Sequence, residues 1–331
     1  MKRILFVIGL ILSVFSFVSC DVEFTPNEDW QEQMMVYSVL DQDDDTSYVR
    51  VEKVFLGNGN ALHYAMEKDS LYYQANDLDV KIFVYNINDT NNIVDVLQFD
   101  YTTTYKPEGE FYSGEVPLYF CKTKNRLSPD KFYKLEVTNL KTGFKATSTT
   151  YLVADYSVLT SNFTFNNNSG RSMLVKWTNV DGYNFNTNTI AKRFQINIRF
   201  NYRQNAQIHH VDMPLSAQTN TSLTAKSLET KVNKEDIVLY LKNALGGVAG
   251  ISWYDAAPFE INVLGCDQEM FDYISINNAT EASINFKPSY SNIKGGYGLF
   301  GARRTHISRS YSTQQVDQQL RTALNGVITF Q

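Results

Sequence analysis

Hydrophobic and polar residues alternate in short runs along the first half of the chain. In the clearest run Tyr133, Leu135 and Val137 share one face, and the lysine and glutamate between them share the other. A period of two residues is typical of a half-buried β-strand. Runs of this kind predict strands over residues 34–40, 48–55, 80–85, 93–101, 132–137 and 144–151. Short strands at such spacing, with turn residues between them, predict an antiparallel β-sandwich.

The second half combines the strongest strand pattern with three helical patterns. Apolar and polar residues alternate from Phe194 to Tyr202, and apolar runs over 174–177 and 259–263 predict further strands. Apolar residues at helical spacing predict three helices, which run from Asn233 to Gly246, from Gln268 onward, and from Ser312 or Thr313 to Gly326. In the first half we expect at most one helical turn, or a flap, over 61–66.

These patterns predict a mainly β protein. We expect two consecutive antiparallel β-sandwich domains of immunoglobulin or fibronectin type, the second decorated with a few short α-helices. A chain of 331 residues exceeds the usual length of one domain, and the strand pattern relaxes near residue 152. The predicted parts are a signal peptide over 1–19, a lipidated tether over 20–30, and the two domains over 31–152 and 153–331.

The N-terminal segment predicts export and lipid attachment. Lys2 and Arg3 precede an apolar run over 4–18, which is shorter than the roughly 20 residues of a membrane-spanning helix. Cys20 follows at the point where such segments are processed, and residues 17–20 resemble the lipobox of bacterial lipoproteins, with Phe17 in place of the usual leucine. We therefore expect Cys20 to carry the lipid, as palmitate or a similar acyl chain. An uncleaved anchor or an ordinary signal peptide remains an alternative.

Charge and cysteine content narrow the range of partners. Removing Lys2 and Arg3 from the 30 Lys and Arg residues leaves 28 against 35 Asp and Glu, a formal net charge of −7. An acidic chain lacks the excess of basic residues that binds the phosphates of nucleic acid, so we expect no nucleic-acid partner. Cys121 and Cys266 remain after lipidation of Cys20, and we favour two separate buried thiols over a disulfide.

Three patterns carry candidate chemistry, and each has a plainer interpretation. Residues 296–301 have the sequence GYGLFG, which matches the dinucleotide fingerprint, but no strand–helix–strand unit surrounds it. We expect a glycine-rich loop that lets the backbone pass close to another element. Four aspartates within 41–45 lack the ligand spacing of a calcium loop and predict a solvated turn. His209 and His210 are adjacent on a predicted strand and point to opposite faces, so they are poorly placed to share one metal ion. We expect no metal site and no cofactor.

Exposed aromatic residues are candidates for stacking on sugars, although for any single one of them we favour a place in an aromatic-rich core. The candidate ligand-contact residues are Tyr64, Tyr72, Tyr73, Trp253 and Tyr254. Nothing in the sequence selects a pair of carboxylates for glycoside hydrolysis. We therefore expect no catalytic residues.

The chain resembles a group of Bacteroidota outer-membrane lipoproteins, of unestablished function, that are built from two consecutive β-domains. The resemblance is carried by the acidic tether after Cys20, by residues 51–73 and 127–137, and most specifically by residues 291–302. It implies that the glycine-rich segment is a structural loop of the family, with Asn292, Gly295, Gly296, Gly298 and Gly301. It also implies an association with TonB-dependent transporters in nutrient uptake or surface assembly.

Together these features predict a non-enzymatic outer-membrane lipoprotein that binds a transporter or a surface glycan. One alternative is a carbohydrate-active enzyme or glycan-binding surface protein whose carboxylate or aromatic site is not recognisable in the sequence. Another is a structural subunit of a surface appendage, in which residues 327–331 would take part in strand exchange. The side of the membrane stays open.

Overall fold

A computed structural model describes residues 32–54, 61–109, 111–159, 172–179, 187–221, 227–253, 258–277, 290–310, 314–326 and 328–330. Residues Gln33–Gln331 form one compact unit. Strands dominate it, which confirms the predicted mainly β fold class. The predicted signal peptide and the tether with Cys20 lie outside the described residues. No helix in the described residues is long and apolar enough to cross a membrane.

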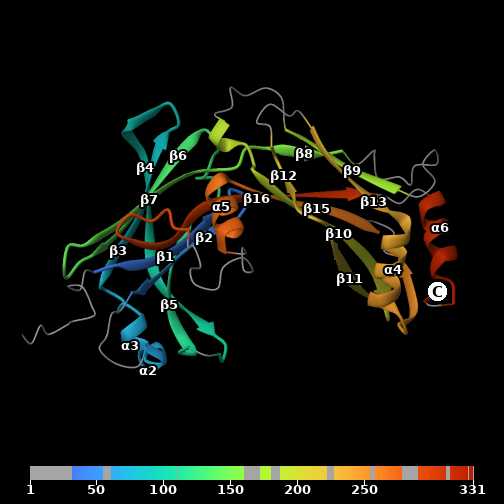
Figure 1. The fold of residues 1–331 in the computed structure, drawn as a ribbon, viewed down its shortest axis with the longest axis horizontal. Coiled ribbons are helices and arrows are strands. Elements are labelled where there is room, and N and C mark those ends of the chain that lie inside the picture. Colours follow the sequence, from blue (N-terminus) through green and yellow to red (C-terminus); the bar gives the residue numbers. More distant parts are fainter. Residues whose placement is uncertain are drawn as a thin grey trace, which may run out of the picture. The chain divides into compact units, whose positions relative to one another are not determined.

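The first seven strands lie side by side in the order β1-β2-β5-β4-β3-β6-β7 (Figure 1). Their bounds are Met34–Leu40 (β1), Thr46–Lys53 (β2), Leu78–Asn86 (β3), Asp89–Lys106 (β4), Gly114–Lys122 (β5), Lys131–Asn139 (β6) and Lys145–Tyr151 (β7). All six strands predicted here are present. β5 was not predicted, because Pro117 interrupts its pattern. Pro117 pairs with Thr103 of β4 and lies outside the paired residues of β2, so its missing N–H leaves no partner unsatisfied.

The strands of the second half are Tyr156–Val158 (β8), Ser172–Asn179 (β9), Arg193–Gln204 (β10), Gln207–Pro214 (β11), Gln218–Thr219 (β12), Ser227–Asn233 (β13), Ala249–Trp253 (β14), Phe259–Cys266 (β15), Gly296–Ser310 (β16) and Thr329–Phe330 (β17). In this half, β10 pairs with β11, β12, β14 and β15. Among the described residues, β13-β9-β8 form a separate small sheet, and all other strands belong to one large mixed sheet.

Alternation along the strands places one face of each in the core. Val80, Ile82 and Val84 of β3 are buried, as are the three apolar residues of β6 from Tyr133 to Val137 that were predicted to share a face. On β10 every second residue from Phe194 to Tyr202 is buried, which confirms the strongest predicted pattern. Such burial supplies about 1.5–3 kcal/mol for each large apolar side chain.

β16 pairs with two different strands along its length. Residues 296–302 run parallel to β1, and residues 303–310 run antiparallel to β15. A Cβ atom at Gly296 would lie 1.8 Å from the Met34 carbonyl oxygen, and one at Gly298 would lie 1.9 Å from that of Val36. The expected close approach of the backbone is therefore confirmed.

The prediction of a glycine-rich loop was wrong for Gly296, Gly298 and Gly301, which lie inside this strand. Gly296 and Gly298 carry no side chain that would collide with β1, so they permit strand pairing there, whereas a Cβ at Gly301 would lie 3.2 Å from an Asp267 carboxylate oxygen. Asn292 and Gly295 precede the strand, and the Asn292 side chain exchanges hydrogen bonds of 2.7 and 2.9 Å with the backbone of residue 300. The division into domains 31–152 and 153–331 stays a prediction.

Short helices cover parts of the sheets. They are Ala61–Ala65 (α2), Lys68–Leu71 (α3), Lys234–Leu245 (α4), Gln268–Asn277 (α5), Gln314–Leu324 (α6) and the 3-10 turn Thr187–Thr189 (η2). The three helices predicted in the second half are present, α5 packs on β16, and α4 packs against α6 (Figure 1). α2 fits the predicted helical turn. α3 was missed, because four residues are too few to show a helical period.

Candidate functional site

A pocket of about 640 Å³ lies where four loops meet the middle of β16. Its walls come from the β1–β2 turn, the β3–β4 turn, the β5–β6 loop, the segment after β7, η2 and one β16 residue. The lining residues are Gln42, Asp43, Ile87, Asn88, Asn125, Leu127, Ser128, Pro129, Asp130, Ala154, Asp155, Thr189 and Arg304. Most of the lining residues are polar, and Ile87, Leu127, Pro129 and Ala154 add apolar surface.

Arginines from β16 organise one wall of this pocket. The Arg304 Nε lies 3.3 Å from a carboxylate oxygen of Asp43, and its guanidinium also pairs with Asp155. The neighbouring Arg303 lies 3.4 Å from Asp41 and 3.5 Å from Asp44. These contacts join the β1–β2 turn and the segment after β7 to the same strand.

The acidic segment is a turn, as predicted, but it is not simply solvated. Asp41 is only 4% exposed, and one of its carboxylate oxygens accepts a hydrogen bond of 3.1 Å from the Asp43 backbone N–H. Burial raises the pKa of Asp41 above its usual value, while Arg303 opposes that rise. The prediction failed for Asp41 because its counter-charges come from β16, about 260 residues further along the chain.

The pocket as a whole carries an excess of negative charge. Among the described residues that line it, Asp43, Asp130 and Asp155 are acidic and Arg304 is the only basic one. Burial lowers the pKa of Arg304 from its usual value, and the nearby Asp43 partly restores it. Carboxylates accept hydrogen bonds, arginine donates them, and the amides of Gln42, Asn88 and Asn125 do both. The walls can therefore bind a ligand that is itself both donor and acceptor.

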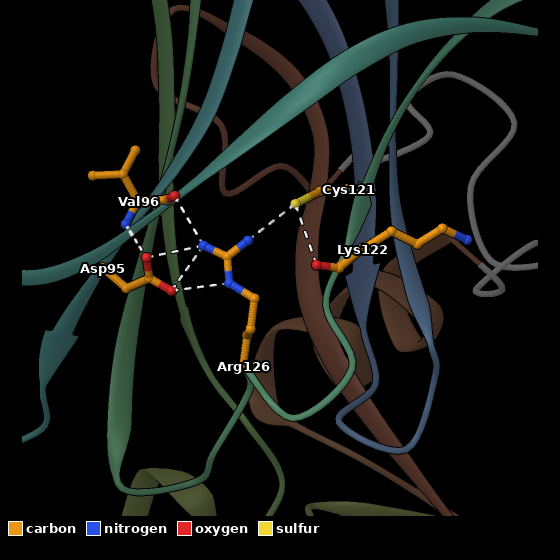
Figure 2. Close-up of polar contacts among 5 residues, drawn as sticks. All are labelled: Asp95, Val96, Cys121, Lys122 and Arg126. Atoms are coloured by element: carbon orange, nitrogen blue, oxygen red, sulfur yellow. Dashed lines mark hydrogen bonds and ion pairs between the residues drawn. The ribbon is translucent and has the colours of Figure 1, made fainter.

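Arg126, next to the pocket residue Asn125, connects β4 to β5 through side-chain hydrogen bonds. Figure 2 shows its guanidinium between Asp95 and Cys121. It donates two hydrogen bonds of 2.9 Å to the Asp95 carboxylate and one of 3.8 Å to the Cys121 sulfur. The Cys121 thiol in turn donates to the Lys122 carbonyl oxygen at 3.7 Å. Burial raises the pKa of Cys121 despite the nearby arginine, so this thiol is not activated as a nucleophile.

Cys266 is the second free thiol, and burial raises its pKa to about 12. The structure thus confirms the expectation of two separate buried thiols. In a Cys20→Ala variant we expect both to react with a maleimide at least about tenfold more slowly in buffer than in urea, because only the exposed thiolate is reactive. Mass spectrometry would measure this, with Cys121→Ser and Cys266→Ser leaving one thiol each. Fast labelling of the folded protein at either cysteine would contradict the prediction.

The aromatic residues proposed to contact a ligand do not gather in one place. Tyr72, Tyr73 and Trp253 are buried, which fits the alternative that they belong to the core. Tyr64 is half-buried on α2, and its ring lies 6.2 Å from that of His63. Tyr254 lies outside the described residues.

Histidines and acidic residues form no metal site among the residues that the structure describes. His209 stacks on Tyr202, with 5.5 Å between the ring centroids, while His210 is more exposed on the same strand. His306 lies against Tyr156, and burial lowers its pKa.

The sequence interpretation missed two groups of residues that matter most here. It gave no role to Arg303 and Arg304, although two adjacent arginines complement an acidic turn elsewhere in the chain. It also missed Asp267, which is 3% exposed and whose burial raises its pKa to about 7.

No family model matches the chain, and no curated protein sequence matches it.

Proposed function

We propose that the protein is an outer-membrane lipoprotein that acts by binding, as an accessory to a TonB-dependent uptake or surface-assembly complex. One observation carries the proposal, namely the basic start, the apolar run over 4–18 and the cysteine at position 20. A pocket with mixed donors and acceptors on a β-rich body supports a binding role.

The proposal includes two consecutive sandwich-type units, over 31–152 and 153–331. The alternation of buried and exposed residues along β3, β6 and β10 supports strands with one covered face. The first half of β16 would then complete the first unit by pairing with β1, although it belongs to the second unit in sequence. The first unit would act as a spacer or docking module near the lipid.

Lipid attachment is the first test. In the native host, the wild-type protein is expected to incorporate an alkyne-labelled palmitate and to sediment with outer membranes. Cys20→Ala is expected to lose the label and to leave the membrane fraction, because a single residue carries the acyl chains. Cys121→Ala is the matched control and should keep both properties. An unlabelled wild-type protein would overturn the proposal.

Partner binding is measured on the same membranes. Purification of the wild-type protein in a mild detergent, followed by mass spectrometry, is expected to recover a transporter in stoichiometric amount. A protein that is lipidated but always recovered alone would remove the transporter from the proposal.

A further inference from the structure

An aromatic row crosses the outer face of the sheet β4-β3-β6-β7. On β3, β6 and β7 the residues that alternate with the row, namely Val84, Tyr133 and Thr150, are buried, and a register shift between β3 and β4 brings Ile93 opposite Tyr85. Strand pairing sets four residues side by side on the opposite face. This aromatic row consists of Ile93, Tyr85, Phe132 and Tyr151.

The rings of the aromatic row touch one another and remain accessible. The ring centroids of Tyr85 and Phe132 are 6.1 Å apart, and those of Phe132 and Tyr151 are 5.0 Å apart. All three rings are half-buried, and Ile93 at the end of the row is 51% exposed. Phe83 and the exposed Val96 lie one step further along the same face and widen the apolar surface.

The chain segments that follow or precede the aromatic row contribute residues to the pocket. Ile87 and Asp130 line the pocket. Ile87 follows Tyr85 by two residues, and Asp130 precedes Phe132 by two residues. The Ile87 N–H donates a hydrogen bond of 3.0 Å to the Asp130 carbonyl oxygen, so the strand pairing continues to the pocket wall. Asp155, also in the lining, lies four residues beyond Tyr151. Three neighbouring strands thus lead from an aromatic surface to a polar pocket.

The chemistry of this combined surface selects a class of ligand. Hydroxyl groups both donate and accept hydrogen bonds, as a wall of amides, carboxylates and one arginine requires. The C–H faces of a sugar ring pack on aromatic rings, which expose a large apolar area. In the described part of the lining, Asp43, Asp130 and Asp155 outnumber Arg304, and this excess of negative charge disfavours an acidic ligand.

We propose that the pocket and the aromatic row together bind a neutral oligosaccharide, with a terminal sugar in the pocket and the following sugars on the rings. This inference rests on the proposed binding function and names its ligand class. It assigns ligand contacts to Tyr85, Phe132 and Tyr151, and to Asn88 in the pocket.

Isothermal titration of the full chain carrying Cys20→Ala tests the inference. The probes are hexasaccharides of neutral glucans, mannans and xylans, with oligogalacturonate as the acidic comparison. We expect at least one neutral probe to bind and oligogalacturonate not to bind. Phe132→Ala and Asn88→Ala should each weaken that binding about tenfold or more, whereas Tyr105→Ala, which alters an exposed tyrosine of β4 outside the row, should not. Thermal melting of each variant establishes that it is folded.

Three outcomes overturn the inference. In the first, none of the neutral probes binds at millimolar concentration. In the second, a neutral probe binds, but Phe132→Ala and Asn88→Ala leave its affinity unchanged. In the third, lipidated Phe132→Ala no longer copurifies with a transporter that the wild type retains. The last would make the aromatic row a protein-docking surface. Each leaves the lipoprotein proposal standing, since that depends on labelling at Cys20. Loss of labelling would remove the proposed function whether or not a sugar binds.

Discussion

Gly298→Ala is expected to lower the free energy of unfolding by about 3 kcal/mol. Two effects add at this position. Its φ of +126° lies in a region that side-chain-bearing residues rarely adopt, and an added Cβ would lie 1.9 Å from the Val36 carbonyl oxygen. Because the obstacle is backbone, β1 and β16 must separate locally to admit a methyl group. Urea unfolding followed by tryptophan fluorescence would measure the loss.

Gly109→Ala is the matched control. Nothing lies within 4 Å of a Cβ built at Gly109, so this substitution should change the stability by less than about 0.5 kcal/mol. If Gly298→Ala proved as stable as Gly109→Ala, the close pairing of β16 with β1 would be wrong. Gly296→Ala, with its Cβ 1.8 Å from the Met34 carbonyl oxygen, offers an independent check without a positive φ.

Local patterns explain how much of the fold was predictable. The alternation around Leu135 and Ile198 is imposed by burial of one face of a strand, so it is visible in any short window of sequence. β5 was not predicted, because Pro117 disfavours a strand in the sequence. It is tolerated in the structure because it lies outside the part of β5 that pairs with β2. Residues 296–301 were predicted to form a loop, because the need for glycine at positions 296 and 298 arises only when β1 lies alongside. No short window of sequence contains both segments.

The candidate site was less predictable for the same reason. The turn over 41–45 could be recognised from composition, but its ion pairs with Arg303 and Arg304 arise from the fold. The pocket draws on loops from several strands, and none of these loops has a distinctive motif by itself. The aromatic row depends on strand register, because Tyr85, Phe132 and Tyr151 become neighbours only when β3, β6 and β7 pair.

Asp267 joins three elements through its buried carboxylate. One oxygen accepts a hydrogen bond of 2.9 Å from the Met270 N–H and thereby caps α5. The other accepts bonds of 2.8 Å from the Ala302 N–H of β16 and from the Thr150 hydroxyl of β7. Asp267→Ala leaves these buried donors without an acceptor and is expected to cost about 3 kcal/mol of stability.

The pH dependence separates the charge of Asp267 from its hydrogen bonds. Burial raises the pKa of Asp267 to about 7 from the ordinary value of 3.8, so the folded protein holds a proton that the unfolded chain releases. The contribution of this group to stability is therefore fully present below pH 4 and is lost as the pH rises through about 7. The Thr150 hydroxyl can accept the proton of the neutral acid and turn to the Tyr151 carbonyl oxygen, 3.4 Å away.

Asp267→Asn tests this directly, because the amide has nearly the same shape and does not ionise. It keeps only one oxygen for the two N–H donors, so it should be less stable than the wild type at pH 5 by about 1–3 kcal/mol. The difference should shrink at pH 8, where the wild type carries a buried negative charge. Urea unfolding of both proteins at the two pH values measures it. A gap that widens between pH 5 and pH 8 would show that the three hydrogen bonds hold Asp267 ionised and that desolvation does not dominate.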